Sequence, residues 1–212
     1  MRVSLPAVRP SLRHLALAAC LPVLLTACEA VQAVVPESLR PVAEAPAPPP
    51  MRWDHRPEAE VWTATAFSAM EGHGAALPAI TPRDIDTWCP GYAEGTEDER
   101  KAFWAGLISA LAKHESTWNP RAVGGGGRWY GLVQIAPATA RGYGCEARSG
   151  EALKNGEANL SCAIRIMART VSRDQVVSAG MRGVAADWGP FHSGRKREDM
   201  RAWVSTQPYC AG

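Results

Sequence analysis

The chain has 212 residues, of which 46% are hydrophobic, with 23 Lys and Arg against 21 Asp and Glu. Three arginines and no acidic residue precede residue 28, so the remainder carries 20 basic and 21 acidic side chains. This balance gives no electrostatic case for nucleic-acid binding, and the length beyond residue 28 suits a tether and one folded domain of ordinary size.

The N-terminus has the pattern of an export signal. Three arginines precede an apolar stretch over residues 15–27, which is too short to span a bilayer. The stretch ends in Leu25-Thr26-Ala27-Cys28, which resembles the lipobox of bacterial lipoproteins, where the cysteine becomes the acylated first residue. We interpret residues 1–27 as a lipoprotein signal peptide and Cys28 as the lipidation site. An ordinary signal cleaved nearby, which leaves Cys28 as a free thiol, is the alternative.

Composition divides the rest of the chain into three parts. Residues 28–52 are rich in Pro and Ala and predict an extended tether. Residues 53–84 have a weak helical pattern broken by glycines and prolines, and we expect a helical N-terminal extension packed on the domain or on a partner. Residues 85–212 predict the main domain.

The main domain reads as helices with short breaks. Thr96 and Glu99 have the spacing of a capping box, which predicts a helix from there through Glu115, ended by Asn119-Pro120. Further helices are expected at about 137–144, 157–177, 182–187 and 195–206. Because no useful strand alternation is present, we expect a mainly α fold with little or no sheet.

Four cysteines remain after Cys20 leaves with the signal and Cys28 is acylated. An even number in an exported chain favours two disulfides, and three connectivities are open. We prefer Cys89–Cys210, which fastens the two ends of the domain, and Cys145–Cys162. No two of these cysteines lie close in sequence, and the residue four after His114 is Trp118 rather than a second histidine, so we expect no metal.

Glu115 is the candidate catalytic residue. It follows Leu111, Ile108 and Trp104 by four, seven and eleven residues, so it extends the apolar stripe of its helix. Partial dehydration there raises the pKa of a carboxyl group, as a general acid requires near neutral pH. The alternative is a rim glutamate whose carboxylate reaches water.

Four ordered motifs follow within 26 residues: Glu115-Ser116, Asn119-Pro120-Arg121-Ala122, Gly131-Leu132-Val133-Gln134-Ile135 and Pro137-Ala138-Thr139-Ala140. Together they resemble the soluble lytic transglycosylase family, which has a lysozyme-like helical domain. The resemblance implies non-hydrolytic cleavage of the MurNAc–GlcNAc β-1,4 bond of peptidoglycan, leaving a 1,6-anhydro-muramyl end, with Glu115 as the single acid and base and no cofactor.

The resemblance also implies a set of substrate-binding residues and has two departures. Val133 stands where the family has Met, and Ala186 stands where the family motif Ala-Tyr-Asn-x-Gly has its tyrosine. A lysozyme-like hydrolase that uses Asp187 as a second carboxylate, and a non-catalytic wall-binding lipoprotein, remain alternatives. The implied substrate-binding residues are Ser116, Tyr130, Gly131, Leu132, Gln134, Asp187 and Trp188.

The expected partners follow from these assignments. They are peptidoglycan glycan strands and, through lipidated Cys28, a membrane. We expect a monomeric periplasmic protein, anchored in the outer membrane rather than the inner one, while endo or exo cleavage and the residue that replaces the family tyrosine stay open.

The lipobox assignment makes one direct prediction. Replacing Cys28→Ser removes the only thiol that the signal pattern marks for acylation, so the protein should no longer incorporate radiolabelled palmitate in bacterial cells. Cys20→Ser is the matched control and should leave labelling unchanged. Palmitate incorporation into the Cys28→Ser variant would contradict the assignment.

Overall fold

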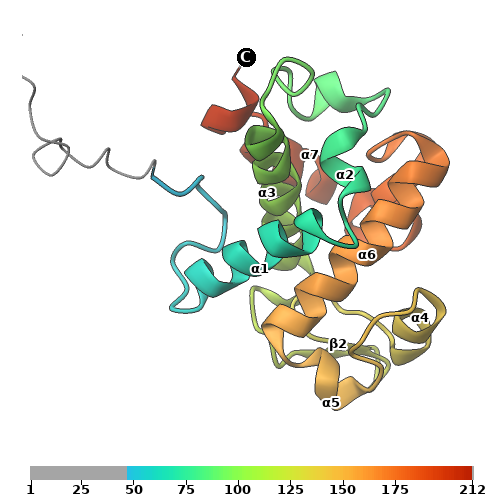
Figure 1. Cartoon of the computed structure of the whole chain (residues 1–212). Helices are drawn as coiled ribbons and strands as arrows, with labels where there is room; N and C mark the ends of the chain where they lie inside the picture. Colours follow the sequence, from blue (N-terminus) through green and yellow to red (C-terminus); the bar gives the residue numbers. More distant parts are fainter. Residues whose placement is uncertain (1–46, 212) are drawn as a thin grey trace, which may run out of the picture. The chain divides into compact units, whose positions relative to one another are not determined.

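The computed structural model describes residues 47–211, and the prediction for Cys28 and most of the tether lies outside them. Within that range the chain forms seven α-helices, several 3-10 turns and one small hairpin (Figure 1). None of the described helices combines the length and apolarity needed to cross a membrane.

The helix α3 (Glu97–Ser116) runs through the centre of the fold. It begins with the predicted capping box, in which the Thr96 hydroxyl accepts from the Glu99 amide at 3.3 Å and the Glu99 carboxylate accepts from the Thr96 amide at 2.7 Å. Every residue from 101 to 112 is buried. The prediction that α3 has one apolar face is therefore wrong, because neighbouring elements cover this helix on all sides.

Three helices pack directly on α3. They are α1 (Ala59–Glu71), α2 (Ala76–Ala79) and α7 (Gly194–Val204), while α6 (Gly156–Asp174) packs on α1 and α2. Trp62, Leu77 and Val204 are buried with the residues of α3 in one hydrophobic core. The segment expected as an N-terminal extension thus packs on the domain and contributes to its core.

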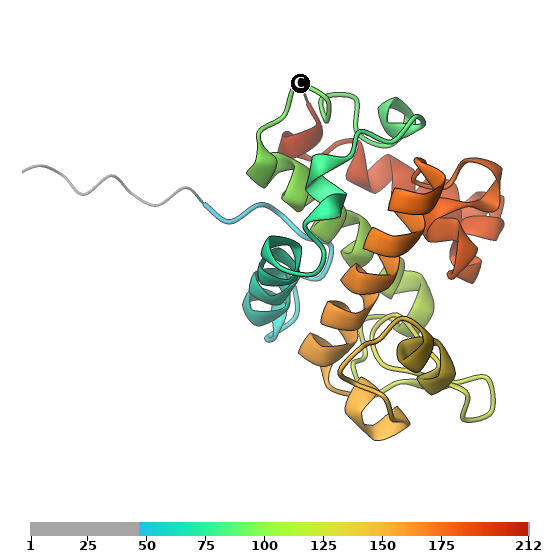
Figure 2. The same cartoon turned by 45° about the vertical axis from the view of Figure 1, so that its right-hand side comes forward.

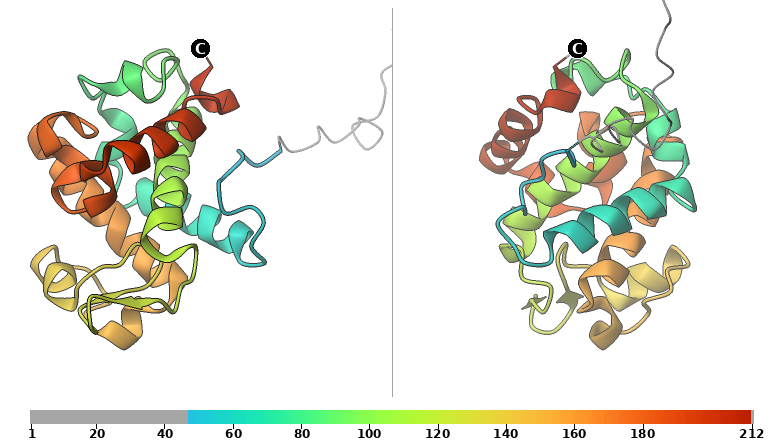
Figure 3. Two further views of the ribbon diagram at one scale, coloured as in Figure 1. Left: turned by 180° about the vertical axis from the view of Figure 1, so that it is seen from behind. Right: turned by 60° about the vertical axis from the view of Figure 1, so that its left-hand side comes forward.

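The last residues of the expected tether also belong to the folded unit. Met51, in the expected tether, and Trp53, the first residue of the expected extension, are buried, with 3% and 0% of their surface exposed. The Arg52 amide donates to the Ser109 hydroxyl of α3 at 2.9 Å, and the Tyr209 hydroxyl donates to the Pro50 carbonyl at 3.3 Å. The segment before α1 consequently lies along α3 (Figure 3).

The hairpin and the two short helices that follow it lie at the carboxyl end of α3 (Figure 2). Strands β1 (Val123–Gly124) and β2 (Trp129–Tyr130) form an antiparallel hairpin, followed by α4 (Pro137–Gly142) and α5 (Gly150–Leu153). The helix expected at 182–187 is a 3-10 turn, η4. The 3-10 turns are η2 (Ile85–Thr87), η3 (Ala179–Met181), η4 (Gly183–Ala186), η5 (Gly189–His192) and η6 (Pro208–Cys210).

Two disulfides close the fold. Cys89 is bonded to Cys210 with 4.6 Å between their Cα atoms, and Cys145 is bonded to Cys162 with 5.2 Å between theirs. The first joins the segment before α3 to η6, and the second joins the segment after α4 to α6. The prediction of a mainly helical, lysozyme-like fold with two disulfides is confirmed.

The two disulfides should contribute differently to stability. Cys89–Cys210 closes a sequence separation of 121 residues and Cys145–Cys162 one of 17. In the chain-entropy model the longer loop gains about 4 to 5 kcal/mol and the shorter about 3 kcal/mol. Replacing both cysteines of the first pair with serine should lower the free energy of unfolding in urea by about 1 to 2 kcal/mol more than the same change in the second pair. The reverse order would contradict this ranking.

Candidate functional site

Glu115 is the penultimate residue of α3, where the helix ends abruptly. Its side chain is half-buried, and the chain leaves the helix through two consecutive residues in the left-handed region, Thr117 with φ 52° and Trp118 with φ 55°. Non-glycine residues rarely adopt this conformation. A hydrogen bond from the Trp118 indole to the Ser109 carbonyl, at 2.9 Å, helps to hold the reversal in place.

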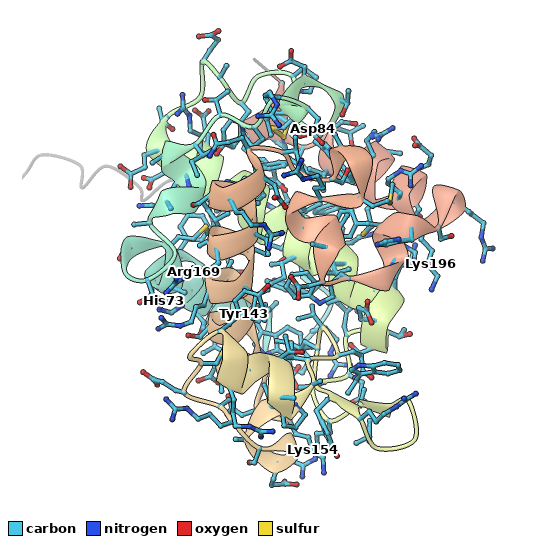
Figure 4. The ribbon with its side chains drawn as sticks, turned by 90° about the vertical axis from the view of Figure 1, so that its right-hand side faces the viewer. His73, Asp84, Tyr143, Lys154, Arg169 and Lys196 are labelled. Atoms are coloured by element: carbon cyan, nitrogen blue, oxygen red, sulfur yellow. A yellow bond between two sulfur atoms is a disulfide. The ribbon has the colours of Figure 1, made fainter. Side chains whose placement is uncertain are left out.

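The surroundings of Glu115 favour its protonated form. Burial raises the pKa of its carboxyl group from 4.5 to about 7, while the Lys196 ammonium on α7 acts in the opposite direction. Lys196 is labelled in Figure 4. Among residues 47–211 no group donates a hydrogen bond to the Glu115 carboxylate, so the loss of water by its anion is offset only in part, by the Lys196 charge. The carboxyl group can therefore hold a proton near neutral pH.

Ser116 ties the end of α3 to the turn that follows the hairpin. Its hydroxyl donates to the Leu132 carbonyl at 2.7 Å. The turn itself is closed by reciprocal hydrogen bonds between the backbones of Tyr130 and Ile135, at 3.1 and 3.0 Å. Gly131 has φ +82°, and a Cβ there would collide with the Leu153 carbonyl and the Asn159 amide. Glycine is the residue that fits this position.

Asn159 fastens the turn to α6, and the sequence analysis did not identify it. This fully buried side chain accepts from the Val133 amide at 3.0 Å and donates to the carbonyls of Tyr130 and Leu153, both at 3.0 Å. Its position beside Leu160 in an apolar helical pattern is the signal that could have found it, because a buried amide needs partners.

Gln134 and Tyr130 form hydrogen bonds to backbone carbonyl groups in and around the hairpin. The Gln134 amide group donates to the carbonyls of Ala122 and Gly131 at 3.2 and 2.9 Å, from a backbone with φ 49°. The Tyr130 hydroxyl donates to the Gly127 carbonyl at 2.6 Å. Both side chains are half-buried, which leaves part of each accessible.

The motif around residues 185–189 approaches the turn through Trp188. Its indole donates to the Val133 carbonyl at 2.8 Å, and only 3% of its surface is exposed. Leu132 is fully buried beside it in the core. Trp188 thus links η4 and η5 to the turn. Neither it nor Leu132 offers much surface to a ligand.

Asp187 lies at the surface and is held by a tyrosine from another element. The Tyr143 hydroxyl, at the end of α4, donates to the Asp187 carboxylate at 3.0 Å (Figure 4). Loss of water raises the pKa of Asp187, against the Tyr143 hydrogen bond and the Arg173 charge. Ala186 is exposed at the place of the family tyrosine, and Tyr143, the tyrosine beside this motif, bonds Asp187 rather than Glu115.

The structure therefore brings Glu115, Ser116, Gly131, Leu132 and Gln134 into one unit with Trp188 behind it. Two surface hollows of about 280 and 430 Å³ lie along α1 and α6, and neither is lined by Glu115. The residues grouped at the end of α3 are therefore not part of either hollow.

A stability measurement tests the dehydration of Glu115. Burying the Glu115 carboxylate lowers the free energy of unfolding. This penalty is absent below about pH 4.5, where the carboxyl group is protonated in both the folded and the unfolded protein. It grows as the pH rises and levels off above about pH 7. Glu115→Gln should therefore raise the free energy of unfolding by up to about 3 kcal/mol at about pH 8, and by less than about 1 kcal/mol at about pH 5. Glu94→Gln, on the surface, is the control, and an effect of Glu115→Gln that is equal at both pH values would contradict the burial.

Comparisons with known proteins bear on the family and the fold of the chain. Residues 93–180 match the family model of the transglycosylase SLT domain. Two glutamate-to-glutamine mutants of DslA superpose with a TM-score of 0.69 and 27% identity, covering 76% of this chain and 97% of theirs. Wild-type DslA has a TM-score of 0.68 with the same identity and coverage. A search of curated proteins found no match. The match over residues 93–180 and the fold shared with DslA together support a lysozyme-like domain of the transglycosylase SLT family in this chain.

Proposed function

We propose that this domain is a peptidoglycan lytic transglycosylase that cleaves the MurNAc–GlcNAc β-1,4 bond and leaves a 1,6-anhydro-muramyl end. The match of residues 93–180 to the SLT domain supports peptidoglycan as the substrate. The observation that carries the proposal is the Glu115 carboxyl group, with a pKa raised to about 7 at the end of α3. At neutral pH such a group is divided between its acid and its base forms, and the reaction needs both.

Glu115 acts twice in the proposed mechanism. The protonated carboxyl first donates its proton to the glycosidic oxygen as the bond to the muramyl C1 breaks. The resulting carboxylate then accepts the proton of the muramyl C6 hydroxyl, whose oxygen bonds to C1 and closes the anhydro ring. Because the substrate supplies its own nucleophile, the second carboxylate used by most glycoside hydrolases is not required.

The hydrogen bonds of the site divide the expected substrate-binding residues into two groups. Ser116, Gly131, Leu132 and Trp188 support the turn, because their polar atoms or their burial commit them to the protein. Direct contact with sugar falls to side chains that keep accessible surface. These are Tyr130, Gln134 and Asp187.

A lysozyme-like hydrolase is the second candidate function. The observation that favours it is the carboxylate of Asp187, which is at the surface and held in one orientation by Tyr143. An ionised Asp187 would activate a water molecule in place of the C6 hydroxyl. A wall-binding lipoprotein without catalysis is the third reading, motivated by the alanine at position 186 in the place of the family tyrosine.

The proposed location follows from the signal pattern and the disulfides. Two disulfides are typical of a protein that folds in an oxidising compartment, which supports export to the periplasm. We place the domain on a lipid anchor at Cys28, in the outer membrane.

Analysis of the released muropeptides tests the mechanism. Purified sacculi are digested with a soluble form in which Cys28 is replaced, and the products are measured by mass spectrometry. We expect products one water lighter than reducing muropeptides, and we expect Glu115→Gln to lower their release by about 100-fold or more. Asp187→Asn is the matched carboxyl-to-amide control and should still yield the anhydro products.

The other products have defined meanings. Reducing ends that disappear in Asp187→Asn would establish the hydrolase and overturn the transglycosylase. Binding to sacculi without release of any product, unchanged by Glu115→Gln, would establish a binding module.

A further inference from the structure

An ionic cluster, formed by Arg52, Lys113, His114 and Asp199, lies beside the last turn of α3. The Asp199 carboxylate on α7 accepts two hydrogen bonds from Arg52, at 2.7 and 3.0 Å. It also accepts from Lys113 at 3.1 and 3.2 Å and from the His114 ring at 2.7 Å. One carboxylate therefore joins three segments: the N-terminal segment, α3 and α7.

The charges in the cluster make Asp199 its necessary centre. The Arg52 guanidinium, followed by Lys113 and His114, holds the pKa of Asp199 well below its usual range, so this residue stays ionised. Burial lowers the pKa of His114, so its ring is neutral at neutral pH and donates through Nε2–H. Arg52 and His114 each expose only 14% of their side chains. Removing the Asp199 carboxylate leaves the largely buried His114 ring without its acceptor and leaves Arg52 with only its bond to the carbonyl of residue 199, at 3.3 Å.

The position of the cluster connects it to Glu115. Lys113 and His114 are the two residues directly before Glu115 on α3, and Thr117, two residues after it, already has a left-handed backbone. The last turn of α3 is thus held by the hydrogen bonds from Lys113 and His114 to Asp199 and by the hydrogen bond from Ser116 to Leu132. A helix end that leads into unfavourable backbone angles needs such external support.

We infer that Asp199 is a positioning residue for Glu115, and that through Arg52 it makes the placement of the acid depend on the docked segment 50–53. This inference rests on the proposed function of Glu115. The hydrogen bonds from Lys113 and His114 fix the rotation of the last α3 turn, which sets the direction of the Glu115 carboxyl. The hydrogen bonds from Arg52 hold the segment 50–53 against the Asp199 carboxylate.

Kinetics on soluble glycan-strand fragments tests the inference with the folded exported chain. Asp199→Asn should lower kcat by about 10- to 100-fold, because small displacements of a catalytic group have effects of that size. KM should stay within about twofold, since Asp199 is not placed among the residues that contact sugar. Asp199→Glu restores the charge and should recover most of the lost kcat.

Two further variants sharpen the comparison. Glu198→Gln is the matched control, because Glu198 is the neighbouring acid on α7, pairs only with Arg201 among the described residues, and should leave kcat unchanged. His114→Phe removes a neutral donor without leaving a charge unpaired and should lower kcat in the same direction, so it serves if Asp199→Asn does not fold.

Amide hydrogen exchange gives a readout that does not require activity. Residues 113–117 should exchange at least about tenfold faster in Asp199→Asn or His114→Phe than in Glu198→Gln. Unchanged exchange in this turn, or an unchanged kcat in an active enzyme, overturns the inference. If the wild-type protein releases no product but the variants still exchange faster, the positioning role of Asp199 is supported and the proposed function is refuted. The two failures are therefore distinguishable.

Discussion

The candidate site is organised around one carboxyl group that is partly removed from water at the end of a helix. A helix end is normally the wettest part of the helix, because its last carbonyl groups have no partners within it. Here the chain reverses immediately after Glu115 through Thr117 and Trp118, both in the left-handed region. The reversal turns the following segment back along α3, where the Trp118 indole bonds the Ser109 carbonyl, and burial at this helix end raises the pKa of the Glu115 carboxyl group. The cost in backbone strain must be offset by contacts elsewhere.

Those contacts come from distant parts of the sequence and meet at the turn over residues 130–135. Ser116 reaches it from α3, Asn159 from α6 and Trp188 from between η4 and η5. Each supplies a hydrogen bond to a backbone group, so the turn is fixed by side chains and not by a sheet. The hairpin alone, with two residues in each strand, would not hold such a shape. The site is therefore rigid in its support while the carboxyl group itself has no hydrogen-bonding partner within the described residues.

Local signals in the sequence predicted local structure well. The capping box at Thr96 fixed the start of α3, and the even number of exported cysteines predicted two disulfides. Long-range packing was less accessible. The stripe that ends at Glu115 suggested a half-exposed helix, but α3 is buried on all sides because α1, α2 and α7 cover it. The roles of Asn159 and Asp199 depend on which elements meet in space, which periodicity along one helix does not encode.

The Cys89–Cys210 bond has a consequence for how the chain matures. Cys210 follows Cys145 and Cys162 in the sequence, so in a chain that is threaded from the N-terminus its thiol emerges after theirs. In an exported chain, Cys89 would until then share the compartment with Cys145 and Cys162 and lack its correct partner. An oxidant that acts on the emerging chain can join Cys89 to either of them, and such a pair must be exchanged later through thiolate attack. In the molecules where this happens, correct pairing of the domain would require a disulfide isomerase as well as an oxidase.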